Sequence, residues 1–157
     1  MSKILNFNLP WVESDLFHFF LKYRPKKIKK AAKFFHDNGY IIVDLKLSKN
    51  YISKTINDIK KLALDSNSKK NPKYYHYNES PRIIEGFKKS KFIKELCHHK
   101  IIINLLKKLY EKKPIPINSI NFLKGTDQPL HSDYMHFGSI PHKYLAASWI
   151  ALENTDN

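Results

Sequence analysis

The stretch NFLKGTDQPLHSDYMHF, residues 121–137, decides which fold we expect for this chain. Gly125 and Pro129 predict a turn, and the residues after that turn predict the start of a strand. On a strand, residues i and i+2 point to the same side, so His131 and Asp133 are expected to present an imidazole and a carboxylate to one point. These donors suit Fe(II) in a facial triad of two histidines and one carboxylate, which leaves three coordination positions open.

The spacing of His131 and Asp133 does not identify a metal site by itself. The chain has eight histidines and eight aspartates, so chance gives about 0.4 pairs at this spacing. A histidine hydrogen-bonded to a nearby carboxylate is the alternative interpretation. Among the other histidines, His98 and His99 are predicted at a helix boundary as surface or cap residues. His136 and His142 lie near the pair and are expected to be substrate-side or structural.

Two helices are predicted in the first forty residues, separated by Pro25, which stops or kinks a helix. The first has an apolar face at helical spacing, formed by Leu16, Phe19, Phe20 and Tyr23,. The second runs from about Lys26 to Asn38 with Gly39 as its C-terminal cap, and its buried face is expected to comprise Ile28, Ala31, Ala32 and Phe35.

Further helices are predicted after residue 48. Ser48 is suited to cap a helix whose apolar stripe is Ile52, Ile56, Ile59 and Ala63,. A polar loop is expected from Asp65 to Pro72. Shorter helical segments follow at about Lys91 to Cys97 and about His99 to Lys112, where Pro114 and Pro116 end the pattern.

The predicted strands are concentrated in the last third of the chain. Residues 117–123 alternate in part between apolar and polar side chains, and residues 144–152 are apolar with aromatic and β-branched members, so both stretches predict strands,. Residues 40–44 predict an earlier short strand, and residues 74–77 an edge strand or loop wall. We therefore predict one α+β domain over residues 1–157, mainly helical over 1–112 and a sheet over 113–157.

Composition limits the classes of function. The only cysteine, Cys97, cannot form an intramolecular disulfide, which predicts a reducing, cytoplasmic setting. No signal peptide or membrane-spanning stretch is seen, so no membrane partner is expected. The net charge of +14 invites a nucleic-acid interpretation,. Only Arg24 and Arg82 among 28 basic residues are arginine, so a solvated lysine surface is favoured, while a preference for anionic substrates stays open.

Residues 121–137 resemble the metal-binding strand of the phytanoyl-CoA dioxygenase family. Residues 144–154, YLAASWIALEN, resemble a following strand of the same family. Residues 35–43, FHDNGYIIV, match its usual opening of helix, glycine and first strand. The similarity spans about residues 30–157, and its specific part lies in the stretches 121–137 and 144–154.

The resemblance implies a double-stranded β-helix, or jelly-roll, core with helices packed on one sheet. It implies an Fe(II)/2-oxoglutarate-dependent dioxygenase that uses O2, with iron on His131 and Asp133. It suggests that Trp149 lines the co-substrate pocket, although a core aromatic is an equal alternative. Asn121 and Lys124 are further candidates for 2-oxoglutarate contacts, and a surface lysine is the alternative for Lys124. Related iron halogenases lack the carboxylate, so Asp133 favours hydroxylation of a small-molecule substrate.

The chain also departs from the family pattern. No residue can be matched to the family's distal histidine or to the arginine that binds the far carboxylate of 2-oxoglutarate. We therefore expect an N-terminal part of an oxygenase, with weak iron affinity and no turnover by itself. The alternatives are a non-catalytic basic module that binds nucleic acid or anionic ligands, which predicts salt-sensitive binding, and a degenerate remnant.

Overall fold

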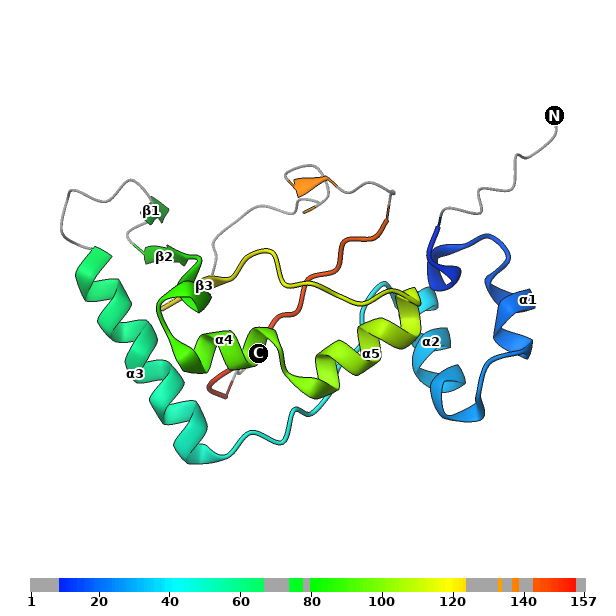
Figure 1. Cartoon of the computed structure of the whole chain (residues 1–157), viewed down its shortest axis with the longest axis horizontal. Coiled ribbons are helices and arrows are strands. Elements are labelled where there is room, and N and C mark those ends of the chain that lie inside the picture. The colour runs from blue at the N-terminus through cyan, green and yellow to red at the C-terminus, as the bar shows by residue number, and fades with distance from the viewer. Residues whose placement is uncertain are drawn as a thin grey trace. The chain divides into compact units, whose positions relative to one another are not determined.

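A computed structural model describes residues 9–66, 74–77, 80–123, 133, 137, 138 and 143–154. Within these ranges the fold is α+β, as predicted (Figure 1). The packing divides the chain into two compact units. Unit 1 comprises Met1–Asp44, Ile101–Pro114 and His131–Ser148, and unit 2 comprises Leu45–Lys100, Ile115–Leu130 and Trp149–Asn157. The expectation of one domain stays a prediction.

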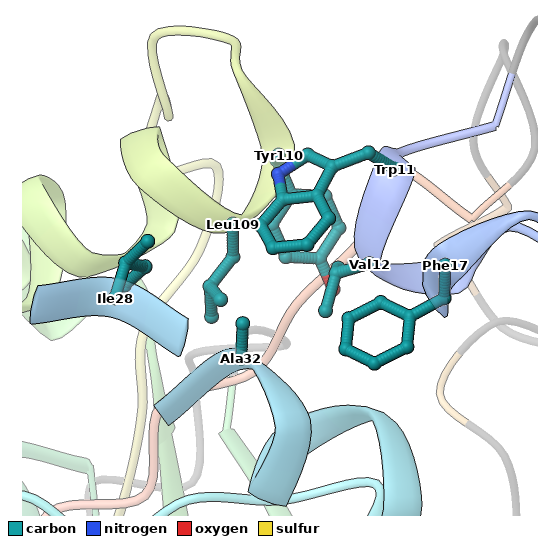
Figure 2. Packing of buried hydrophobic residues seen from close by; sticks show 7 residues of the cluster. All are labelled: Trp11, Val12, Phe17, Ile28, Ala32, Leu109 and Tyr110. Carbon is teal, nitrogen blue, oxygen red and sulfur yellow. The ribbon is translucent and has the colours of Figure 1, made fainter. Parts of the chain in front are cut away.

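Unit 1 contains the 3-10 helix η1 (Trp11–Glu13) and the helices α1 (Phe17–Lys22) and α2 (Lys26–Asn38). It also contains all but the first residue of α5 (Lys100–Tyr110). Figure 2 shows side chains from all four elements directed toward one another. This core consists of Trp11, Val12, Phe17, Ile28, Ala32, Leu109 and Tyr110. Burying such a cluster is the main source of stability for a unit of this size.

The ends of α2 follow the sequence signals. Pro25 precedes its first turn, and Gly39 adopts φ +77° at its C-cap, where its N–H donates to the Phe35 carbonyl at 2.8 Å. Glycine takes this left-handed conformation without steric cost. Ile28 and Ala32 are buried as predicted, and Ala31 and Phe35 pack partly buried beside them.

The apolar face predicted for α1 is buried only in part, since Phe20 packs partly buried against the unit 1 core. Phe17 is the fully buried residue of this helix, while Phe19 and Tyr23 are exposed. Phe17 stacks on Trp11, with ring centroids 5.6 Å apart. The buried face of such a short helix is determined by its tertiary contacts, and here Trp11 of η1 provides the contact for Phe17.

Unit 2 contains α3 (Lys49–Ser66), the 3-10 helix η2 (Gly86–Lys88) and α4 (Lys91–Cys97). Ser48 caps α3 as predicted, since its Oγ accepts from the Tyr51 N–H at 3.2 Å. Ser90 caps α4, accepting from Ile93 N–H and donating to the Asp58 carboxylate at 2.6 Å. The unit 2 core is aliphatic and consists of Ile59, Leu62, Ala63, Ile83 and Ile93.

The sheet in the described part of the chain is small. It has three antiparallel strands in the order β1 (Tyr74–Tyr77), β2 (Ser80–Ile84) and β3 (Ile120–Phe122). Opposite partners include Tyr75 with Arg82, and Ile83 with Asn121. β1 is an edge strand, one of its two predicted forms, whereas β2 was not predicted.

Two predicted strands are wrong, because residues 40–44 and 144–152 have no strand structure. The strand expected over residues 117–123 shortens to β3, and α3 continues through the first residues of the loop expected from Asp65. Strand propensity produces a strand only where a neighbouring strand accepts its hydrogen bonds. The described residues show no double-stranded β-helix core.

Candidate metal centre

Asp133 is the one proposed iron ligand within the described residues. Its side chain is exposed, and its backbone is helical, as is that of Phe137. The sequence argument placed Asp133 on a strand, so that expectation was wrong at this position. The alternation of side chains along a strand therefore no longer supports the pairing of the two ligands. His131 lies outside the described residues, as do Ser132, His136 and His142.

Asn121 lies on β3, opposite Ile83 of β2. Its Oδ1 is buried and has no hydrogen-bond partner among the described residues. The same oxygen is 2.5 Å from the point that a Cβ of residue 86 would occupy. Only glycine fits at position 86 without displacing the amide. A buried, unsatisfied carbonyl oxygen is costly, so Asn121 is a polar group available to a ligand that can reach it.

The η2 turn holds Gly86 against Asn121. The Glu85 N–H donates to the Ser119 carbonyl at 2.8 Å, and the Phe87 N–H donates to Ser119 Oγ at 3.1 Å. Sequence reasoning missed this contact because residues 86 and 121 are far apart along the chain. A lone glycine before a helical segment gives no signal of which distant residue approaches it.

Trp149 is 80% exposed and lies in a segment without helix or strand. The alternative that it is a core aromatic on a buried strand therefore does not describe it. Its neighbour Leu152 does pack partly buried against the unit 2 core. Tryptophan side chains are highly buried on average, so an indole with this exposure is unusual. Lys124, the remaining co-substrate candidate, lies outside the described residues.

The structure does not bring the candidate residues into one described site. Asp133 belongs to unit 1, whereas Asn121 and Trp149 belong to unit 2. Within the described ranges, no group of three His, Cys, Asp or Glu side chains could hold a metal ion. An imidazole nitrogen and a carboxylate oxygen are suitable ligand types for Fe(II). Of these two, only the carboxylate of Asp133 lies within the described residues.

Other histidines have structural roles. The His36 Nδ1 lies 2.7 Å from the Val12 carbonyl, and its ring stacks on Phe17 with centroids 3.9 Å apart. His98 caps the C-terminus of α4, with its Nδ1 2.9 Å from the Lys94 carbonyl. The surface or cap role predicted for His98 is confirmed. Neither ring is directed at a group of metal ligands in the described chain.

The shifted titratable groups belong to packing rather than to the candidate centre. Burial raises the pKa of the Cys97 thiol, which makes this thiol a weak nucleophile at neutral pH. Burial, and then the Glu95 carboxylate, raise the pKa of Tyr51 to about 12. The Tyr51 hydroxyl donates to the Phe92 carbonyl at 2.7 Å, which joins α3 to α4.

Comparisons with family models, curated proteins and solved structures find no match to this chain. Among the helices that the structure describes, none is long and apolar enough to cross a membrane.

Proposed function

We propose that this chain carries part of the active site of an Fe(II)/2-oxoglutarate-dependent hydroxylase of the phytanoyl-CoA dioxygenase type. The observation on which this proposal depends is the sequence of residues 121–137, in which His131 and Asp133 follow Gly125 and Pro129. In this proposal His131 and Asp133 are two of the three protein ligands of the iron. The substrate is a small molecule, and Cys97, a free thiol, favours a reducing, cytoplasmic location.

Three structural features support the proposal without testing it. The helix α2 and Gly39 match the helix and glycine of the family's opening, whereas residues 40–44 form no strand. The side chain of Asp133 is exposed to solvent. Trp149 is exposed as well, which suits a residue whose ring faces a ligand better than one buried in a core.

When bound, Fe(II) and 2-oxoglutarate supply the activation of O2 that C–H hydroxylation requires. The residues of this chain bind and orient these groups. Asp133 contributes a negative charge that strengthens metal binding, and a neutral His131 contributes a nitrogen donor. The amide of Asn121 provides a hydrogen-bonding group for the co-substrate. The indole of Trp149 provides an apolar wall that limits the access of water.

Paramagnetic NMR tests this assignment residue by residue. Fe(II) is added under anaerobic conditions to the 15N-labelled chain, and the broadening of each amide signal is recorded. We expect the signals of His131, Ser132 and Asp133 to broaden at the lowest metal concentration. His36 and His98, whose rings are engaged with backbone carbonyls, serve as internal controls.

Two outcomes would remove the proposal. One is preferential broadening around His36 or His98, which would indicate adventitious binding to surface imidazoles. The other is the absence of localised broadening at a metal concentration that saturates ordinary two-ligand sites. A basic binding module without a metal centre would give this second result.

A further inference from the structure

The helices α1 and α2 concentrate positive charge on one small part of unit 1. Residues 17–38 contain seven basic side chains and a single acidic one, Asp37. The exposed members are Lys22, Lys26, Lys27, Lys30 and Lys33. The carboxylate of Asp37 accepts a hydrogen bond from Lys33 at 2.6 Å, so it offsets one lysine and leaves the others uncompensated by α2 itself.

The lysines of α2 form a row on the side opposite the core. Ile28 and Ala32 face inward and are buried. Lys26, Lys30 and Lys33 recur at helical spacing, which places them on one outward stripe. This stripe contains no buried group, and its members Lys26 and Lys30, unlike Lys33, have no acidic partner on α2, so they are available to an external partner.

The helix α1 adds exposed aromatic side chains to this charge. Phe17 faces inward, whereas Phe19 is 54% exposed and Tyr23 is 74% exposed. These two rings contact each other edge to face, with centroids 5.3 Å apart. One helical turn separates them, so both occupy the outward side of α1. Exposed aromatic pairs on a water-facing helix indicate a surface that meets something less polar than water.

Contacts within unit 1 fix α1 beside the lysine row. The Lys29 ammonium donates to the Lys22 carbonyl at 2.8 Å, and His36 stacks on Phe17. Lys29 lies one turn from Lys26 and one turn from Lys33 along α2. The side of α2 that holds α1 therefore borders the row, and the aromatic pair and the row form one basic and aromatic surface.

We propose that this basic and aromatic surface binds peripherally to an anionic lipid bilayer. The lysines would lie at the phosphate headgroups, and Phe19 and Tyr23 would enter the interface between headgroups and acyl chains. Lysine-rich faces with aromatic residues favour such an arrangement. No membrane partner was predicted from the sequence, because no segment is apolar enough to span a bilayer. Attachment to the bilayer surface, however, does not require a spanning helix.

Two observations favour lipid over nucleic acid as the partner: the only arginine of this region is engaged elsewhere, and the two exposed rings contact each other. Arg24 is bonded to Glu111 and lies over the Trp11 ring at 4.5 Å, so it is engaged within unit 1. The exposed cations of this surface are therefore lysines. A lysine ammonium is a point charge and cannot make the bidentate hydrogen bonds by which arginine recognises phosphates and bases. The rings of Phe19 and Tyr23 cover each other partly, whereas nucleobases require open ring faces on which to stack.

Vesicle sedimentation tests the proposal with the full chain and no metal, so its outcome is independent of the iron proposal. Vesicles of phosphatidylcholine alone are compared with vesicles that also contain phosphatidylserine. We expect binding only to the anionic vesicles, with an affinity that falls as salt rises. Lys26→Glu/Lys30→Glu should weaken the binding at least tenfold, and Phe19→Ser/Tyr23→Ser at least fivefold. Circular dichroism confirms that each variant remains helical.

The matched control is Lys60→Glu/Lys61→Glu, an equal change of charge at exposed positions of α3 in unit 2. This control should bind anionic vesicles within twofold of the unchanged chain. Three results would overturn the proposal: no binding to anionic vesicles at low salt, an equal loss in the α3 control, or displacement from vesicles by single-stranded RNA that binds the same surface more tightly.

Discussion

The helices α2 to α5 and the segments 40–48, 113–119 and 144–150 differ in how far the sequence predicted their structure. The helices formed close to where the sequence predicted them, whereas these three segments have neither helix nor strand. A helix satisfies its hydrogen bonds within a few residues, while a strand depends on a partner elsewhere. The difference teaches that a helix can be predicted from local sequence, whereas a strand also requires a partner that local sequence does not show.

The largest expected difference in stability is between two isoleucine substitutions, one in a helix and one in a segment without helix or strand. Ile93 of α4 is 2% exposed, and Ile115 in an extended segment is 76% exposed. Ile93→Ala should cost about 3 kcal/mol of unfolding free energy, because it opens a cavity in the unit 2 core. Ile115→Ala should cost less than about 0.5 kcal/mol. Urea denaturation measures both, and similar losses would show that the extended segment is packed after all.

Tyr110 at the end of α5 gives a smaller, pH-dependent effect. Burial, and then the Glu13 carboxylate, raise the pKa of Tyr110 to about 12. Between pH 10 and 12 the unfolded chain therefore releases the phenolic proton while the folded chain keeps it, so stability falls as pH rises. The contribution of this group is at most about 2.7 kcal/mol.

Tyr110→Phe tests this effect, because phenylalanine has no proton to release. Urea denaturation at pH 9 and pH 11.5 should show a smaller loss of stability in the variant than in the unchanged chain. Lysines titrate equally in both proteins and cancel in the comparison. An identical loss in both would mean that Tyr110 is exposed to solvent and that the unit 1 core is looser than Figure 2 depicts.

Gly39 tests how strongly local signals define a helix end. Its φ is +77°, with open space where a side chain would project. Gly39→Ala should therefore destabilise the chain by about 1 kcal/mol through backbone strain alone. Gly39→Asn should cost less, because asparagine tolerates the left-handed conformation. Thermal unfolding monitored by circular dichroism distinguishes them, and equal costs would indicate steric rather than conformational strain.

The two tryptophans offer the smallest energetic effect and a clear optical one. Trp11 is buried in the unit 1 core, and its Nε1 donates to the Lys108 carbonyl at 3.0 Å. Trp149 is exposed, so Trp149→Phe should change stability by less than about 0.5 kcal/mol. The variant should lose the fluorescence that iodide quenches and retain the emission of a buried indole. Protection of Trp149 from iodide quenching would contradict this account, because it would show that the indole is buried.

The sequence predicted the parts of the fold that depend on nearby residues. Pro25, Gly39 and Ser48 marked helix boundaries correctly, because each acts on the backbone within one turn. The buried face of α1 was predicted only in part, because Phe17 is buried against Trp11, a contact that periodicity alone does not reveal. β2 was missed because the short segment from Ser80 to Ile84 contains Pro81, which argues against a strand.

The candidate site could be predicted only as a set of residues. The motif around His131 and Asp133 depends on family resemblance, and helical backbone at Asp133 removes the simple strand geometry. The exposure of Trp149 and the close approach of Gly86 to Asn121 depend on packing between distant segments. Neither leaves a short-range pattern, so no reading of local sequence could have found them.

The central claim is that His131 and Asp133 bind Fe(II), and anaerobic isothermal titration calorimetry tests it most directly. The chain is compared with His131→Ala, with Asp133→Ala and with Asp15→Ala, which removes an exposed carboxylate elsewhere in unit 1. We predict that each of the first two variants lowers Fe(II) affinity at least tenfold, while Asp15→Ala leaves it unchanged. Unaltered Fe(II) affinity in Asp133→Ala would contradict the claim.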